Sequence, residues 1–315
     1  MKNNYLYKNL DYMEASHAFF KGRQGHGIFY RSEDFIVFIT IVSVTVRKMN
    51  LTVLAFCPMF NRVHILFKEI SRKALGIFIR LSCQTFVREY NREYERKGPL
   101  LHKSFGHSIK KGIKIILGCV AYVFNNPVAG RLVESAIDYR WNLLAYKDNK
   151  NPFSKPFNKK TCSYTLRKAL SKIDFFYNSG NYVGYSSLRN IMEGLDKEET
   201  SRAVDYLITR YNFLSFDSLD VLYGGFDNLL IALKSNAGAE FDMEDEYGDH
   251  SCYRTMLKLV IALGYTGKKL NFENLARDKT MALYHYIKLK TRAPVSCVCK
   301  FLHIESLSDV EVVHY

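Results

Sequence analysis

The first half of the chain alternates between strand-like and helix-like segments, and this order constrains the fold most. Two apolar runs, 51–58 and 63–68, are separated only by a short turn-like segment, which is typical of a pair of neighbouring strands. Helical periodicity flanks the pair and predicts helices over 32–50 and 70–96. The β-branched residues of the first of these segments leave a strand open as the alternative there.

Two further strands and one more helix complete the pattern. Residues 15–30 indicate a strand followed by a glycine-containing loop, and residues 100–109 indicate another strand. A helix is predicted over 112–126, ending before Pro127 because proline cannot continue a helix. The order of strand, helix, hairpin, helix, strand and helix predicts an α+β domain, an antiparallel sheet with packed helices.

The second half is predicted to be helical. Residues 147–161 are polar and basic with two prolines, so we expect a domain over 1–150, a basic linker over 151–161 and an all-α domain over 162–315. Asp196 and Glu199 have the spacing of a capping box. Near the end, 281–290 and 295–302 are helix candidates, which makes 281–314 a candidate helix-turn-helix.

Positive charge is concentrated in the first half. Residues 1–160 carry about +16 and residues 161–315 about −2, which together give the net +14 of the chain. Such an asymmetry favours a polyanionic partner, nucleic acid or an anionic membrane, although a basic surface can also serve solubility alone.

Cysteine usage and the absence of apolar spans indicate a cytoplasmic protein that does not enter the membrane. The seven cysteines are scattered, and the one close pair, Cys297 and Cys299, lacks the second pair that a structural zinc site needs. No signal peptide is recognisable at the start of the sequence, and the longest apolar stretch, 35–46, is too short to span a bilayer.

Three segments carry a resemblance to a known family. They are MFNRVHILF at 59–67, AYVFNNPVAGRLV at 121–133 and DYRWNLLAY at 138–146. In this order they resemble the REP-associated tyrosine transposases and the related single-tyrosine HUH transposases of insertion sequences. The resemblance covers about residues 15–146, and its strength lies in three weak motifs that occur in the family's order.

The resemblance implies a ferredoxin-like sheet and a metal-assisted attack on DNA. A divalent ion, Mg²⁺ or Mn²⁺, would polarise the scissile phosphate of single-stranded DNA, and a tyrosine would attack it to form a 5′-phosphotyrosine. Carried over by position, Tyr122 matches the nucleophile, while His64 and Asn126 match metal ligands. The partner would be hairpin or other structured single-stranded DNA, and the family includes both monomers and homodimers.

The residues themselves agree with part of this assignment. Tyr122 and Asn126 are four apart on a predicted helix, so they project from one face. Positive side chains near the helix could contact a DNA backbone; they are Lys110, Lys111, Lys114 and Arg131. The structural alternatives are a core tyrosine, a helix-terminating asparagine before Pro127 and a core histidine.

Position 62 departs from the family, because Arg62 stands where the first histidine of the HUH motif belongs. A guanidinium has no free lone pair and cannot bind a metal. Two interpretations follow: either Arg62 itself neutralises the phosphate as a catalytic residue, or the metal site is lost and the protein only binds DNA. His102 and His107 on the following predicted strand are candidate substitutes for the missing ligand.

An acidic cluster lies in the second half, with members Glu240, Asp242, Glu244, Asp245, Glu246 and Asp249. It lacks the ligand order of a calcium loop, so we expect a solvated loop. A further hypothesis is that this loop shields the basic domain when DNA is absent. The leading prediction is thus a DNA-nicking transposase-like enzyme. The alternatives are a catalytically silent DNA-binding protein and a ferredoxin-like RNA-binding or interaction module.

Overall fold

A computed structural model describes residues 13–235 and 250–305, and its centre is a four-stranded sheet. The strands are β1 (Glu14–Lys21), β2 (Thr52–Pro58), β3 (Arg62–Lys68) and β4 (Gly106–Lys111). Their order is β2-β3-β1-β4, and each neighbouring pair is antiparallel. With the intervening helices this is the ferredoxin-like arrangement, so the predicted α+β fold class is confirmed.

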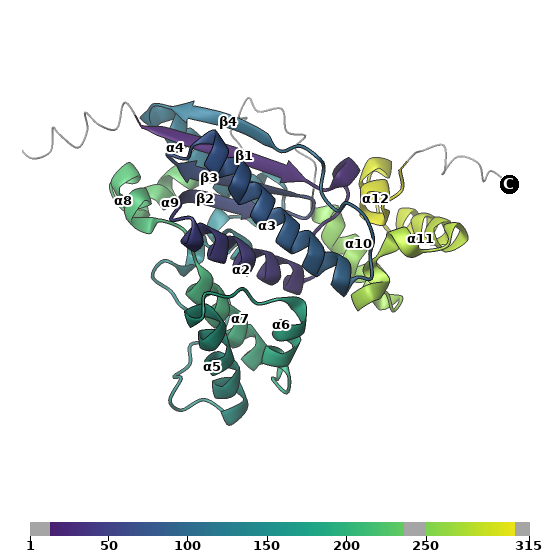
Figure 1. The fold of residues 1–315 in the computed structure, drawn as a ribbon. Coiled ribbons are helices and arrows are strands. Elements are labelled where there is room, and N and C mark those ends of the chain that lie inside the picture. The colour runs from purple at the N-terminus through teal and green to yellow at the C-terminus, as the bar shows by residue number, and fades with distance from the viewer. Residues whose placement is uncertain (1–12, 236–249, 306–315) are drawn as a thin grey trace, which may run out of the picture.

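Helices cover both faces of the sheet (Figure 1). On one face lie α2 (Ser32–Lys48) and α3 (Arg72–Glu93), where Phe20 of β1 meets Phe38 with ring centroids 5.9 Å apart. On the other face lies α4 (Ile113–Ala129). Because both faces are covered, successive residues of the inner strands β1 and β3 are buried. Successive side chains point to opposite faces of the sheet, so their position along the strand decides which helix they meet.

The segment predicted as a helix over 32–50 is a helix, and the alternative of a strand there is wrong. This helix covers residues 32–48. Its first turn is fixed by the Asp34 carboxylate, which accepts hydrogen bonds from the backbone N–H groups of Tyr30 and Arg31, both at 2.8 Å. Such satisfaction of the free N–H groups at a helix start favours the helix over the β-branched preference for strand.

The predicted ends around the fourth strand need correction. The strand expected over 100–109 begins only at Gly106, because Ser104 donates its backbone N–H to the His102 ring at 3.3 Å and turns the chain. The helix expected to stop at Asn126 continues to Ala129 through Pro127. Pro127 has no N–H to donate to the Val123 carbonyl, so the last turn lacks one backbone hydrogen bond, but the Gly130 N–H still closes the helix on the Asn126 carbonyl at 2.8 Å.

The helices that follow residue 162 pack around the sheet domain. They are α5 (Tyr164–Asn178), α6 (Tyr185–Met192), α7 (Lys197–Tyr211), α8 (Phe216–Tyr223), α9 (Phe226–Ser235), α10 (Ser251–Ala262), α11 (Arg277–Lys290) and α12 (Val295–Leu302). Asp196 and Glu199 form the expected capping box at the start of α7. The domain boundaries at 150 and 162 stay a prediction.

These helices contact the sheet domain in three places (Figure 1). Helices α6 and α7 lie against α2, while α8 and α9 lie beside β2 and α4. Helices α10 to α12 lie at the end of the sheet, where Tyr253 stacks on Phe60 with ring centroids 4.1 Å apart. No helix among residues 13–235 and 250–305 is long and apolar enough to cross a membrane.

The buried carboxylate of Asp34 links the helices α2, α3 and α6. Asp34 is completely buried and accepts hydrogen bonds from the hydroxyls of Tyr94 at 2.9 Å and Tyr185 at 2.8 Å. Tyr94 ends α3 and Tyr185 begins α6, so the single side chain links α2, α3 and the C-terminal half. Burial raises the pKa of Asp34 to about 6, against the opposing effect of Arg31 and the hydrogen bonds.

We predict that Asp34→Asn lowers the free energy of unfolding at pH 7 by about 2 kcal/mol, because a buried amide satisfies fewer of these donors. The pH dependence also changes. The folded-state pKa lies above the unfolded one. The part of the stability that depends on the proton of Asp34 is therefore fully present below about pH 4 and is lost as pH rises through 6. Urea unfolding at several pH values measures both effects; an unchanged pH profile in the variant would contradict the assignment.

Candidate tyrosine–histidine site

Tyr122 and His64 meet in the structure, together with a second histidine, His17. The Tyr122 and His64 rings are nearly perpendicular with centroids 5.5 Å apart. His17 stacks on His64 at 5.4 Å and meets the edge of Tyr122 at 5.9 Å. His17 Nε2 and His64 Nδ1 are 3.2 Å apart, a hydrogen bond in which one ring donates to the other.

The strand geometry explains this cluster. His64 pairs directly with Phe19 across β1 and β3, and His17 lies two residues earlier on β1. Residues two apart on a strand face the same side, so both histidines point toward α4 and Tyr122. The sequence does not single out His17. Its spacing of two residues from Phe19 can be read from the sequence, but the strand register that places it beside His64 cannot.

The cluster is closed to solvent. Tyr122 is 1% exposed, and His64 and His17 are 0% and 1% exposed. Burial lowers the pKa of His17 to about 3, with Lys110 and His107 adding to the effect, and it holds the pKa of His64 well below its usual range. Both rings are therefore neutral at pH 7, the form that binds metals but also the form that suits a core.

Asn126 lies one turn beyond Tyr122 on α4 and is also buried. Its side-chain nitrogen donates to the Tyr122 backbone carbonyl at 2.9 Å, so its amide is held along its own helix. Its neighbour Asn125 donates to the Leu233 carbonyl of α9 at 2.9 Å, which ties α4 to the C-terminal half. The two asparagines thus stabilise the position and the end of α4.

Arg62 lies at the start of β3, and one of its guanidinium nitrogens is 3.1 Å from His250 Nε2. The backbone N–H of His250 in turn donates to the Gly130 carbonyl at 3.1 Å. Arg62 therefore joins β3 to the residues before α10 and after α4. A guanidinium at this position and two histidines hydrogen-bonded to each other do not fit the three-ligand metal site that the resemblance implies.

The candidate substitutes His102 and His107 do not complete the site. His107 pairs with Ala18 on β1, so it points toward the face of α2 and α3, away from Tyr122. His102 is exposed in the turn before β4 and contacts Ser104. The position beside His64 is taken by His17 instead.

The four basic residues predicted to contact DNA do not form one surface. Lys110 and Lys111 lie at the end of β4 and Lys114 at the start of α4, and Lys111 pairs with Glu14 at 2.7 Å. Arg131 follows the other end of α4 with φ of 54°. A helix of this length separates its ends by about 25 Å, so these residues lie at opposite ends of the sheet.

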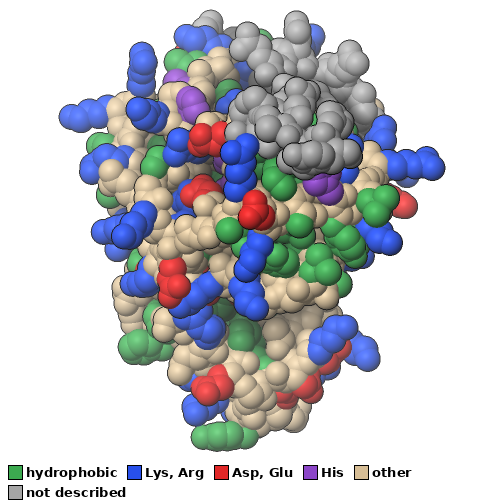
Figure 2. Space-filling view, turned by 90° about the vertical axis from the view of Figure 1, so that its right-hand side faces the viewer, with side chains coloured by type: hydrophobic (Ala, Val, Ile, Leu, Met, Phe, Trp, Pro, Cys, Tyr) green, Lys and Arg blue, Asp and Glu red, His purple; other side chains and the backbone are tan. Residues whose placement is uncertain are grey.

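A basic cavity opens at the Arg62 end of the sheet, and the sequence did not reveal it. Its volume is about 740 Å³, and its charged and aromatic lining consists of Lys21, Arg23, His102, Lys103 and Lys300. Lys21 is the cross-strand partner of Arg62, whereas Lys300 comes from α12. Figure 2 faces this side of the molecule and shows Lys and Arg side chains spread over it.

The candidate helix-turn-helix exists as two helices, but α12 is mostly packed. Val298, Phe301 and Leu302 are buried, and the Phe301 carbonyl accepts a hydrogen bond from the Tyr30 hydroxyl at 2.8 Å. This face of α12 is not available to a DNA groove. Residues 306–314 and the acidic cluster at 240–249 lie outside the described residues.

Comparisons with known proteins find a weak structural similarity and no matching family model or curated protein. No protein-family model matches the chain, and no curated protein matches it significantly. One similar solved structure is described as the REP-associated tyrosine transposase bound to a REP hairpin; it has a TM-score of 0.34 and 13% identity, and it covers 40% of this chain and 73% of that chain. A likeness of this size does not show the family, so the site has to be judged on its own geometry.

The buried histidines predict an acid-sensitive fold. Unfolded histidine takes up a proton near pH 6.5, while folded His17 resists protonation down to about pH 3. Stability is therefore lost as pH falls through this interval. We expect His17→Gln to weaken the slope of unfolding free energy against pH between 6.5 and 4. The exposed His285→Gln serves as the matched control, and equal slopes in both variants would refute the prediction.

Proposed function

We propose that this protein binds structured single-stranded DNA through the basic end of its sheet and that its tyrosine–histidine cluster is catalytically silent. The observation that carries the second part is burial: Tyr122 is 1% and His64 is 0% exposed. A nucleophile must approach its target phosphorus within bonding geometry, and a metal ligand must share an ion with the phosphate. Neither group can do so from inside the core.

The binding surface is supported by the cavity beside Arg62. Lys21, Arg23 and Lys103 are exposed there, and the side chain of Lys300 reaches the same cavity from α12. The lining includes no Asp or Glu; Glu305 contacts Arg23 at 3.3 Å through an exposed ion pair, which is weak in water. Convergent positive side chains of this kind hold the phosphates of a single strand, with release of counterions.

One observation favours a second candidate function, a DNA nickase. The pair of His17 and His64 faces Tyr122, so two imidazoles and a tyrosine converge as they would in an active site, although one histidine comes from a different strand. For this function α4 would have to move away from the sheet to admit the phosphate. The two candidates differ in whether a covalent product forms.

We predict that Lys21→Gln combined with Lys103→Gln weakens binding of a labelled hairpin oligonucleotide and flattens its salt dependence. Each lost phosphate contact lowers the slope of log K against log salt by about 0.7 for single strands, so the double variant should lose roughly 1.4. Fluorescence anisotropy at several salt concentrations measures both quantities.

The control is Lys160→Gln with Lys168→Gln, which removes the same charge from exposed positions at the start of α5. Equal losses in the two double variants would mean that only net charge matters and would refute a binding site at the cavity. Equal or tighter binding of the matching RNA hairpin would favour the RNA-binding alternative.

Catalysis is tested by denaturing gels after incubation with a panel of hairpins and Mg²⁺ or Mn²⁺. We expect no protein–DNA adduct, and no adduct in Arg62→His either, because restoring a histidine leaves Tyr122 buried. An adduct in the unmodified protein that disappears in Tyr122→Phe would overturn the silent site and establish the nickase. An adduct only in Arg62→His would place the defect at position 62 instead of in the closure of the site.

A further inference from the structure

We propose that His26, Glu273 and His303 form a zinc site at the junction between the sheet domain and the C-terminal helices. One ligand atom from each of the three side chains lies within 4.8 Å of the others. Two imidazoles and one carboxylate are a ligand set that suits Zn²⁺, with water as the fourth ligand. This site is separate from the tyrosine–histidine cluster and does not depend on the proposed DNA binding.

The three ligands come from distant parts of the sequence but are held in place locally. His26 follows η1 (Arg23–Gly25) and is 6% exposed. Glu273 is in η6 (Phe272–Asn274), and His303 is the C-cap of α12, in the left-handed region with φ of 60°. The His26 and His303 rings lie 4.5 Å apart. Only Glu273 is substantially exposed, which leaves an entry for the ion.

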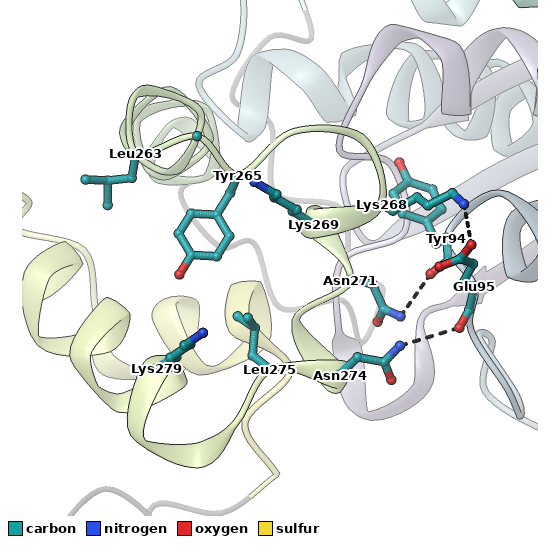
Figure 3. A pocket seen from close by; sticks show the side chains of 11 residues that line it. Tyr94, Glu95, Leu263, Tyr265, Lys268, Lys269, Asn271, Asn274, Leu275 and Lys279 are labelled. Atoms are coloured by element: carbon teal, nitrogen blue, oxygen red, sulfur yellow. Dashed lines mark hydrogen bonds and ion pairs between the residues drawn. The ribbon is translucent and has the colours of Figure 1, made fainter.

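Residues on both sides of Glu273 hold its segment in place, and Figure 3 shows the side chains of two of them, Asn271 and Asn274. Asn271 donates to the Tyr94 carbonyl at 3.1 Å, and Asn274 donates to the Glu95 carbonyl at 3.4 Å. Lys268 of η5 (Gly267–Leu270) forms an ion pair with the Glu95 side chain. The residues that make these contacts line a cavity of about 540 Å³. The contacts hold the segment of Glu273 against the end of α3.

The hydrogen bonds of His303 indicate what its second nitrogen needs. The Tyr30 hydroxyl lies 2.8 Å from the Phe301 carbonyl and 2.9 Å from His303 Nε2. A carbonyl only accepts, so the one hydroxyl proton goes to Phe301 and His303 Nε2 must be the donor to Tyr30. In a neutral ring the lone pair is then on Nδ1, which lies 3.1 Å from the Glu273 carboxylate.

A lone pair that faces a carboxylate repels it unless a positive charge lies between them. Either His303 carries a second proton or a cation binds both groups, and the nearness of His26 favours the cation. A hydrogen bond to a second residue on the other nitrogen of a ligand, as Tyr30 provides for His303, is usual at zinc sites.

Arg96 opposes the ion most directly. Its guanidinium contacts Glu273 Oε1 at 2.5 Å, and this is the same oxygen that lies 3.1 Å from His303 Nδ1. A carboxylate oxygen has two lone-pair positions, so Oε1 can accept from Arg96 with one and bind zinc with the other.

The test is metal binding by the full-length, untagged protein after removal of metals with a chelator. We expect one Zn²⁺ per chain by elemental analysis, and Co²⁺ should give the visible absorption of a low-coordinate site. Glu273→Gln and His26→Gln should each weaken zinc binding at least tenfold in competition with a chromophoric chelator. Zinc should also raise the melting temperature of the parent but not of these variants.

Three matched variants exclude other ligands. His285→Gln removes an exposed histidine of α11, and His17→Gln removes the histidine pair under α4. Cys252→Ser addresses the thiols, since a hydrogen bond from Cys252 lowers the pKa of Cys297 to about 6 and makes that pair a competing site. Zinc affinity should stay at the parent value in all three. No stoichiometric zinc in the parent, an undiminished affinity in Glu273→Gln, or a loss confined to His17→Gln or Cys252→Ser would overturn the proposal.

Discussion

The packing of helices on both faces of the sheet is the constraint on which the rest of the structure depends. With α2 and α3 on one face and α4 on the other, side chains of the inner strands have no route to solvent except at the strand ends. His17, His64 and Tyr122 therefore become core residues, whatever chemistry their types would permit. The polar groups that remain accessible are at the ends of the strands, where Lys21 and Arg62 lie side by side.

The sequence predicted the elements of the sheet domain well because the periodic apolar patterns are local. It could not predict register, and register decides the site. His17 joins His64 only because β1 pairs with β3 so that Phe19 is opposite His64, whereas His107 is turned away because it is opposite Ala18. The approach of distant segments leaves no local signal at all. Examples are the contact of Arg62 with His250 and the shared cavity that Lys103 and Lys300 line. The helix end at Asn126 was placed too early because a proline weakens a helix without always ending it. Here the Gly130 N–H closes the last turn on the Asn126 carbonyl.

The positive charge that the sequence concentrates in the first half is divided between two ends of the sheet. Lys111 lies at one end, with Lys114 at the start of α4, and Arg62 lies at the other end. The end with Arg62 gains Lys300 from the C-terminal half, a half that is slightly acidic as a whole. A site built from both halves depends on their packing. The contact of His26 with His303 and the ion pair of Arg96 with Glu273 bring the two halves together beside it.

The C-terminal helices also determine whether the tyrosine site stays closed. Among the described residues, hydrogen bonds that hold helix α4 to them include Asn125 to the Leu233 carbonyl, the Tyr223 hydroxyl to the Leu117 carbonyl, and the His250 N–H to the Gly130 carbonyl. At about 1 kcal/mol each, these alone would cost about 3 kcal/mol to break, which reduces an open state roughly a hundredfold before any apolar surface is exposed. A nickase would have to recover that free energy from DNA binding in every cycle. A protein that only binds DNA at the end of the sheet has no such cost, because the cavity there is open while α4 stays in place.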